Sequence, residues 1–276
     1  MIVRVPASSA NLGPGFDALG MALTLYAEVG AGEPNEGAQI ADEFHPATVA
    51  FRSHGGEGPL WVRSPIPVGR GMGFSGAVRV GGLVAAHAQH NGADHDALLA
   101  ALPELLRLAT DLEGHADNVA ASLYGGIVAT AGGHAVRVPL SFDPAMVMWV
   151  PSFETSTDES RRKLAAAVPM ADVVFNIGRT ALLVAALAAG DVDVLRVATQ
   201  DRVHQNLRFA AAAPSRVALE SAFDSGAWAA WLSGSGPTVA VMCAVDEAEA
   251  LAAALPPDGH TKILRIDHVG AVIEAA

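Results

Sequence analysis

A glycine-rich stretch, residues 65–77, combines the residue types and the spacing best suited to chemistry. It reads Pro-Ile-Pro-Val-Gly-Arg-Gly-Met-Gly-Phe-Ser-Gly-Ala and follows a β-like run at 60–62. Glycines let several backbone N–H groups converge on one anion, and the start of the following helix adds the positive end of its dipole. This pattern indicates a phosphate cradle in which Ser75 offers a hydroxyl to a metal. A plain strand-to-helix turn is the alternative, and the Walker loop is excluded because no Gly-Lys-Ser/Thr follows.

The elements that must position this stretch mix helices and strands without a repeat. Strands are expected at 2–5, 19–29, 127–131, 135–140, 146–150, 228–231, 239–245 and 261–266, the last being the final strand, and helices at 77–87, 94–108, 119–124, 158–167, 170–189, 215–223 and 246–255. Residues 47–52 fit either a short helix or a strand. The irregular alternation favours an α+β protein over a doubly wound sheet. A change in character near residues 141–144 predicts two domains, 1–141 and 142–276.

Composition narrows the class of protein and its partners. The chain has 276 residues, of which 51% are hydrophobic and 17% are charged, so it has ample material for a buried core. Its net charge is −12 and no basic stretch stands out, which argues against nucleic acid as a partner. An acidic surface favours solubility but does not identify a substrate.

Cysteine usage and the hydropathy pattern indicate a cytoplasmic protein without a membrane partner. The single cysteine, Cys243, rules out an internal disulfide framework and fits a reducing compartment. Its neighbours are apolar, so a buried strand thiol is favoured over a nucleophile. The N-terminus lacks the pattern of a signal peptide, and no uninterrupted apolar run is long enough to span a bilayer.

Four stretches, residues 6–17, 69–77, 113–118 and 232–238, together resemble the GHMP kinase superfamily, and within it the homoserine kinase family. They occur in the family's order and span nearly the whole chain. The resemblance implies an α+β, two-domain GHMP kinase fold. Its N-terminal α/β domain would contain a left-handed βαβ-type unit, and its C-terminal α+β domain would be ferredoxin-like. It also implies ATP-dependent phosphorylation of the side-chain hydroxyl of L-homoserine, with ATP and Mg²⁺ as cofactors.

For the nucleotide, the resemblance implies that the two glycine-rich stretches bind the phosphates. The implied residues are Pro67, Gly69, Arg70, Gly71, Met72, Gly73, Phe74, Ser75, Gly76 and Ala77 in the first stretch, and Gly234, Ser235 and Gly236 in the second. Ser75 and Glu113 are the implied metal ligands, because one hydroxyl and one carboxylate beside the phosphates suffice for magnesium. For Glu113, a charge at the start of a helix is the structural alternative.

For the substrate, the resemblance implies a site that holds both charged ends of an amino acid. The implied residues are Asn11, Asp17, His115, Arg161 and Arg208. Two arginines suit a carboxylate because guanidinium geometry is bidentate, and Asp17 suits an ammonium group. Exposed helix arginines are the alternative at both positions, more strongly at Arg161 because two further basic residues adjoin it.

For catalysis, the resemblance implies Asn118, Thr157 and Arg161. Several GHMP kinases carry an aspartate at the position of Asn118 as a candidate base, whereas homoserine kinases resemble this chain. Asparagine cannot take a proton. Catalysis is therefore expected to rest on positioning, Mg²⁺ and donors around the γ-phosphoryl group.

The chain departs from the family pattern in ways that keep other functions open. Phe74 replaces a small polar residue beside the expected phosphates, and Gly76 weakens the helix start by about 1 kcal/mol relative to alanine. Residues 204–208 lack the usual Pro-Tyr-Arg ending. A GHMP kinase for another small alcohol, or a non-catalytic nucleotide- or metabolite-binding protein, are the alternatives. Family habit predicts a possible homodimer.

Overall fold

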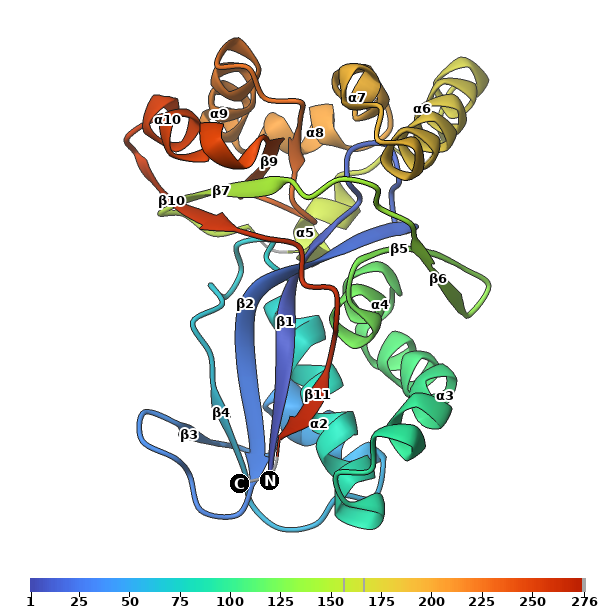
Figure 1. Ribbon diagram of the computed structural model, residues 1–276, viewed down its shortest axis with the longest axis vertical. Coiled ribbons are helices and arrows are strands. Elements are labelled where there is room, and N and C mark those ends of the chain that lie inside the picture. The colour runs from blue at the N-terminus through green and yellow to red at the C-terminus, as the bar shows by residue number, and fades with distance from the viewer. Residues whose placement is uncertain (156, 166, 275–276) are drawn as a thin grey trace.

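Two antiparallel sheets with their helices form the molecule, and they are stacked along its longest axis (Figure 1). The computed structural model describes residues 1–274 except 156 and 166, and the side chains of residues 157–159 also lie outside the description. The two ends of the chain lie together at one end of the molecule, because the last described strand pairs with the first.

The first sheet contains seven strands in the order β11-β1-β2-β4-β3, with β5 and β6 attached through β2. They are β1 (Ile2–Ala10), β2 (Leu19–Ala31), β3 (Gln39–Ala41), β4 (Leu60–Arg63), β5 (Ile127–Ala131), β6 (His134–Val138) and β11 (Val272–Glu274). β2 has 13 residues and pairs with β1 along one edge. Along its other edge, residues 28–31 pair with β4 and residues 19–21 with β5. It curves toward the second sheet as it does so (Figure 1).

Four helices cover the first sheet: α1 (Pro46–Ser53), α2 (Phe74–Asn91), α3 (His95–Glu113) and α4 (Asp117–Tyr124). α2 is the central one, and it contacts α1, α3, α4, β1 and β2. Its alanines and glycines keep the side chains small, so neighbouring elements approach closely and most of its length is buried. The start of α2 is thereby fixed at the end of the sheet that faces the second unit.

The second sheet has the order β10-β7-β9-β8, with all pairs antiparallel. Its strands are β7 (Ala145–Pro151), β8 (Ala229–Leu232), β9 (Val239–Cys243) and β10 (Gly259–Leu264). The helices of this half are α5 (Thr157–Arg162), α6 (Met170–Ala189), α7 (Leu195–Ala198), α8 (Gln205–Phe209), α9 (Ala213–Asp224) and α10 (Ala248–Ala254). Strands and helices in this order and pairing form a ferredoxin-like unit, which confirms that prediction.

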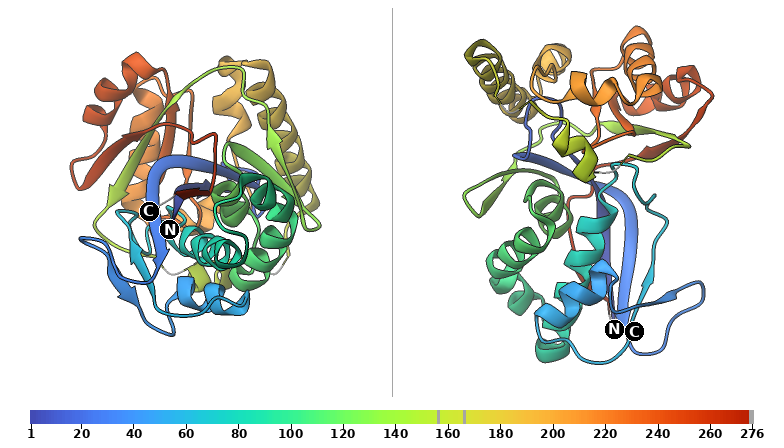
Figure 2. Two further views of the ribbon diagram at one scale, coloured as in Figure 1. Left: turned by 60° about the horizontal axis from the view of Figure 1, so that its bottom comes forward. Right: turned by 180° about the vertical axis from the view of Figure 1, so that it is seen from behind.

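The alternation of side chains along β7 joins the two units into one core. Ala145, Val147 and Trp149 belong to a cluster with residues of α9 and α10. The intervening Met146, Met148 and Val150 belong instead to the large core cluster that contains the first sheet. Because successive residues of a strand point to opposite faces, β7 has helices on one side and the first unit on the other. Figure 2 shows the orange and red helices of the second unit on the side of its sheet away from the first.

Several predicted elements differ from the observed ones. The strand predicted at 261–266 is β10, but it is not the last, because β11 follows and pairs with β1. The helix predicted at 158–167 ends at Arg162. Residues 47–52, left open between helix and strand, lie in α1, whose start is capped by His45 Nδ1. The domain division at 141/142 stays a prediction, and the pairing of β11 returns the end of the chain to the first sheet.

Cys243 is buried in β9, as predicted. Burial, together with the nearby charges of Glu247 and Asp246, raises the pKa of its thiol to about 11. The thiol is therefore protonated at neutral pH and is not activated as a nucleophile.

Among the described residues, one helix, α6, is long and apolar enough to cross a membrane by length and composition alone. A single helix of this kind is weak evidence, because core helices of soluble proteins pass the same test. In α6, 22% of the most apolar 18-residue window is buried.

Asp267 fastens the last segment of the chain to the first sheet. Its buried carboxylate accepts hydrogen bonds from the hydroxyl of Tyr26 at 2.9 Å and from the backbone N–H groups of Val269 at 3.0 Å and Gly270 at 2.7 Å. The turn that leads into β11 is thus held by one side chain.

We expect Asp267→Ala to lower the free energy of unfolding by about 3 kcal/mol. The Tyr26 hydroxyl and the two backbone N–H groups of the turn would lose their acceptor, and unpaired donors in a buried region are costly. Urea denaturation followed by tryptophan fluorescence measures this change. Asp258→Ala, at an exposed position, is the matched control and should leave the midpoint nearly unchanged. Equal midpoints for the two variants would contradict the role assigned to Asp267.

Candidate active site

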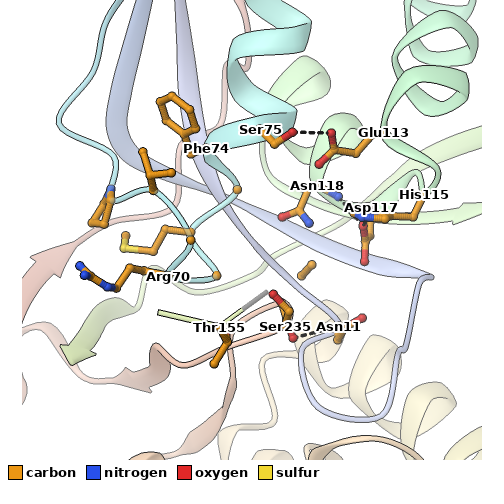
Figure 3. A pocket seen from close by; sticks show the side chains of 18 of the residues that line it. Asn11, Arg70, Phe74, Ser75, Glu113, His115, Asp117, Asn118, Thr155 and Ser235 are labelled. Carbon is orange, nitrogen blue, oxygen red and sulfur yellow. Dashed lines mark hydrogen bonds and ion pairs between the residues drawn. The ribbon is translucent and has the colours of Figure 1, made fainter. Parts of the chain in front are cut away.

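The four predicted stretches meet at one cavity of about 280 Å³ between the two units (Figure 3). The predicted residues that line it are Asn11, Asp17, Pro67, Gly69, Arg70, Gly71, Met72, Gly73, Phe74, Ser75, Glu113, His115, Asn118, Arg161, Arg208, Gly234 and Ser235. Gly76, Ala77 and Gly236 are not among the lining residues. The side chain of Thr157, predicted to be catalytic, lies outside the described part of the chain.

The start of α2 forms one wall of the cavity. Gly73 precedes the helix in the left-handed conformation, with φ 69°, and α2 has no side-chain cap. The N–H groups of the first helical turn have no partner within the helix, and they lie at the positive end of an 18-residue helix. An anion in the cavity would supply their missing acceptor.

Two glycines at the start of α2 have close neighbours. A Cβ at Gly73 would lie 2.0 Å from Ser8 Oγ, in addition to the unfavourable positive φ. A Cβ at Gly76 would lie 3.3 Å from the Cβ of Asn118 and 3.4 Å from Val119. Gly76 therefore weakens the helix start in exchange for a close approach of α4, which carries Asn118.

The Phe74 side chain is directed away from the Ser75–Glu113 pair (Figure 3). Its ring lies edge-on to His45, with 6.2 Å between ring centroids, and it also lines a second cavity beside β3 and β4. The phenyl group therefore does not fill the space in front of the helix start. Arg70 also points away, and its guanidinium donates to the backbone oxygens of Phe153 at 2.9 Å and Ser152 at 2.8 Å.

Ser75 and Glu113, the predicted metal ligands, are in direct contact. Ser75 Oγ donates to Glu113 Oε2 at 2.7 Å, and Arg79 Nε donates to the same oxygen at 2.7 Å. Glu113 is the last residue of α3, so its carboxylate lies at the negative end of that helix rather than at the start of the next one. A carboxylate is disfavoured there by the helix dipole, which makes a nearby cation favourable.

Asn118 is oriented by Ser8, whose hydroxyl donates to Asn118 Oδ1 at 2.9 Å. With its carbonyl oxygen engaged, the Asn118 amide nitrogen is available as a donor. Both residues lie beside the helix start, and Asn118 lines the cavity. This arrangement suits stabilisation of negative charge and not removal of a proton.

His115 and Asp117 form a pair at the same end of the cavity. The Nδ1 of His115 lies 2.8 Å from Asp117 Oδ1. Burial opposes the charged imidazole, but the hydrogen bond and the negative charges of Asp117 and Glu113 together raise the pKa of His115 above its ordinary value. The charged form therefore stabilises the fold below the unfolded pKa of about 6.5, and this contribution is lost as pH rises through the folded pKa.

The predicted substrate residues form a cluster of alternating charge. Arg161 binds the Asp17 carboxylate in a bidentate pair, with Nη1–Oδ2 at 2.9 Å and Nη2–Oδ1 at 2.5 Å. Arg208 is buried, and its Nη1 donates to Gly234 O at 2.8 Å. Its buried Nε has no hydrogen-bond partner among the described residues. Burial and the positive charge of Arg161 lower the pKa of Arg208 to about 10, so it stays charged at neutral pH.

Phe16 and His204 position the two arginines, and neither residue was predicted. The guanidinium carbons of Arg161 and Arg208 lie 5.4 Å and 5.3 Å from the centroid of the Phe16 ring, within the range of cation–π contact. His204 is fully buried, with Nε2 2.7 Å from Gly13 O and Nδ1 3.1 Å from Arg208 Nη1. The Gly13 carbonyl can only accept a hydrogen bond, so Nε2 carries the proton and Nδ1 accepts from Arg208. Burial lowers the pKa of His204, which favours this neutral form.

Asn11 holds two backbone segments of the site by hydrogen bonds. Its Nδ2 donates to Gly234 O at 3.0 Å, and its Oδ1 accepts from the N–H of Asp17 at 3.0 Å. Asn11, Leu12 and Asp17 all have positive φ, at 71°, 46° and 56°. Non-glycine residues in this conformation cost energy and concentrate at functional sites.

We expect Asp117→Asn to lower the pKa of His115, because burial then acts without the carboxylate. The imidazole C–H chemical shifts followed by NMR across pH measure this pKa, and His115→Gln assigns the resonance. Asp111→Asn, on the exposed part of α3, is the matched control and should leave the curve unchanged. An unaltered His115 titration in Asp117→Asn would contradict the assignment.

Two models of known protein families match parts of the chain. Residues 38–126 match the family of GHMP kinases N terminal domains, and residues 183–259 match that of GHMP kinases C terminal domains. A homoserine kinase of Desulfitobacterium hafniense is 37% identical over 98% of this chain and 99% of its own length. A homoserine kinase of Thermus thermophilus is 38% identical over 95% of this chain and 94% of its own.

Solved structures give the same fold. The homoserine kinase of Cytophaga hutchinsonii superposes with a TM-score of 0.83 over 98% of this chain and 96% of its own, at 23% identity. A putative homoserine kinase of Listeria monocytogenes superposes with a TM-score of 0.79 over 100% and 99% of the two chains, at 28% identity. The structural likeness at 23% identity shows the fold alone, while the sequence relatives define the family. The chain therefore belongs to the GHMP kinase superfamily, within the homoserine kinase family.

Proposed function

We propose that this protein transfers the γ-phosphoryl group of ATP to the side-chain hydroxyl of L-homoserine, giving O-phospho-L-homoserine and ADP, a step in threonine biosynthesis. The observation that carries the proposal is the single cavity at which an uncapped helix start meets two arginines and an aspartate. The helix start suits phosphates, and the charged cluster suits the two ends of an amino acid.

The triphosphate would lie against the first turn of α2 and the turn at 234–235. Both segments line the cavity, and the start of α2 offers backbone N–H groups without an acceptor in the helix. The second cavity, of about 250 Å³, shares Val68 and Phe74 with the first and continues toward β3, β4 and His45. It is the space we assign to the nucleoside.

Magnesium fits the residues present, by the chemistry of the donor set. Ser75 Oγ and the Glu113 carboxylate are hard oxygen ligands on the cavity wall, and both hydrogen bonds to that carboxylate end on Oε2, which leaves Oε1 for a cation. Among the described residues no group of three or more His, Cys, Asp or Glu side chains could hold a metal by itself. Phosphate oxygens and water would have to complete the coordination. When bound, Mg²⁺ would neutralise charge on the transferring phosphates.

The amino acid would be bound by exchange of an ion pair. In the structure Arg161 and Asp17 neutralise one another. A zwitterion brings both charges, so its carboxylate would take Arg161 and Arg208 while its ammonium takes Asp17. Two guanidinium groups on one phenyl ring repel each other, and an anion between them removes that repulsion.

Phosphoryl transfer in this site would proceed without a side-chain base at position 118. The substrate hydroxyl oxygen attacks the γ-phosphorus, the bond to the ADP oxygen breaks, and the hydroxyl proton passes to phosphate or solvent. Asn118, held by Ser8, would donate to the phosphoryl oxygens as charge develops on them. Arg161 would orient the substrate, and the predicted contribution of Thr157 stays a prediction.

We also propose a cytoplasmic homodimer with no nucleic-acid or membrane partner. Three apolar side chains of α6, Met170, Val174 and Ile177, are 74%, 61% and 64% exposed and follow one another at helical spacing on one face. An apolar groove lies beside them, lined by residues of α6 and of the loop at 14–18. Family habit predicts a homodimer, and we assign this apolar face of α6 to the second copy because its side chains are otherwise uncovered. Sedimentation velocity should show a dimer, and Ile177→Glu should shift it toward the monomer; a monomeric wild type would contradict the proposal.

A coupled ADP-release assay with Mg-ATP and L-homoserine tests the proposed reaction. We expect turnover that requires homoserine. Arg208→Ala should lower kcat/KM for homoserine by about 100-fold, because a buried charged contact to the carboxylate is lost. Ser75→Ala should instead lower kcat/KM for ATP. Arg107→Ala, an exposed arginine of α3, is the matched control with unchanged kinetics.

Other outcomes separate the alternatives. ATP binding with turnover of a different alcohol would assign a GHMP kinase of another specificity. Binding of ATP and homoserine without product would assign a non-catalytic binding protein. Equal kinetics for Arg208→Ala and Arg107→Ala would remove Arg208 from the substrate site.

A further inference from the structure

Arg79 lies one helical turn after Ser75 on α2, directly against the proposed metal ligands. Its Nε–H lies 2.7 Å from Glu113 Oε2 and 3.3 Å from Ser75 Oγ. Only 20% of the Arg79 side chain and 10% of the Glu113 side chain are exposed, so the ion pair is shielded from water. Arg79 is not among the residues that line the cavity, which places its guanidinium behind Glu113 as seen by a ligand.

This ion pair changes the charge that a nucleotide meets. An isolated Glu113 carboxylate would repel a triphosphate that arrives without metal, because both are negative. A guanidinium in contact with the carboxylate cancels that charge, and it also opposes the entry of Mg²⁺. The position of Glu113 at the negative end of α3 adds to the need for a cation there.

We infer that Arg79 is a built-in cation of the phosphate site, which holds the Glu113 carboxylate against Ser75, weakens its attraction for Mg²⁺ and allows ATP to bind without the metal. The inference rests on the proposed function, since it concerns how the same site takes ATP. Arg79 acts through Glu113 and is therefore a positioning residue. The proposed metal ligand Glu113 therefore has its counter-ion, Arg79, supplied by the protein itself.

Calorimetric titration of ATP into the full chain, once in excess EDTA and once in saturating Mg²⁺, tests the inference. We expect the wild type to bind ATP in both conditions. Arg79→Met should weaken binding in EDTA by about tenfold, because the carboxylate then faces the phosphates uncompensated, and should leave binding in Mg²⁺ equal or tighter. Arg79→Lys retains the charge and should stay close to the wild type.

A second variant protects the test against loss of folding. Arg79→Met leaves Glu113 partly buried without its partner, which destabilises a protein. The double variant Arg79→Met/Glu113→Gln removes both charges, so it should fold and bind metal-free ATP about as well as the wild type. Its affinity for ATP should no longer rise when Mg²⁺ is added, because the carboxylate is gone. Arg107→Met, on the exposed face of α3, is the matched control for loss of an arginine.

The outcomes distinguish this inference from the proposed function. If wild type binds ATP in neither condition, the proposed function fails and the inference fails with it. If wild type binds but Arg79→Met binds equally well in EDTA, the inference alone is overturned. It is also overturned if the double variant binds metal-free ATP as poorly as Arg79→Met.

Discussion

A seam of hydrogen bonds between β1 and the turn that follows β8 is the contact on which the site depends. Ser233 Oγ lies 2.8 Å from Ser9 Oγ and 2.6 Å from Gly71 O, and Trp231 Nε1 donates to Ser9 Oγ at 3.0 Å. All of these groups are buried or partly buried, where an unpaired polar atom is costly. One serine thus fixes three distant segments relative to one another, and the cavity exists because they meet.

The motifs could be predicted from the sequence because backbone geometry dictates their residue types. The positive φ of Gly73 and its close approach to Ser8 require glycine, so the cradle is visible in the sequence itself. Arg79, Phe16 and His204 could not be predicted in the same way. Their roles depend on tertiary contacts with Glu113, Arg161 and Arg208, which lie 34, 145 and 4 residues away along the chain. Only the four-residue spacing from Ser75 to Arg79 and from His204 to Arg208 gave a local signal, since such residues share a helix face.

The sheets show the same limit. Long strands such as β2 were predictable from their apolar runs, and the pairing order of the second sheet followed from the family resemblance. The three-residue β11 carries too short a pattern to stand out, and it exists because β1 presents an open edge and Asp267 turns the chain toward it. Residues 163–165 were expected to continue α5, but the helix ends at Arg162.

Charge placement explains how an acidic chain can attract an anionic ligand. The net charge is −12, yet the start of α2 and three arginines, Arg70, Arg161 and Arg208, line the cavity. Its acids are each paired with a base: Asp17 with Arg161, Glu113 with Arg79 and Asp117 with His115. Pairing cancels the acids without removing them. Because each acid already has a partner within the protein, the charged side chains of the cavity are held in place before any ligand binds.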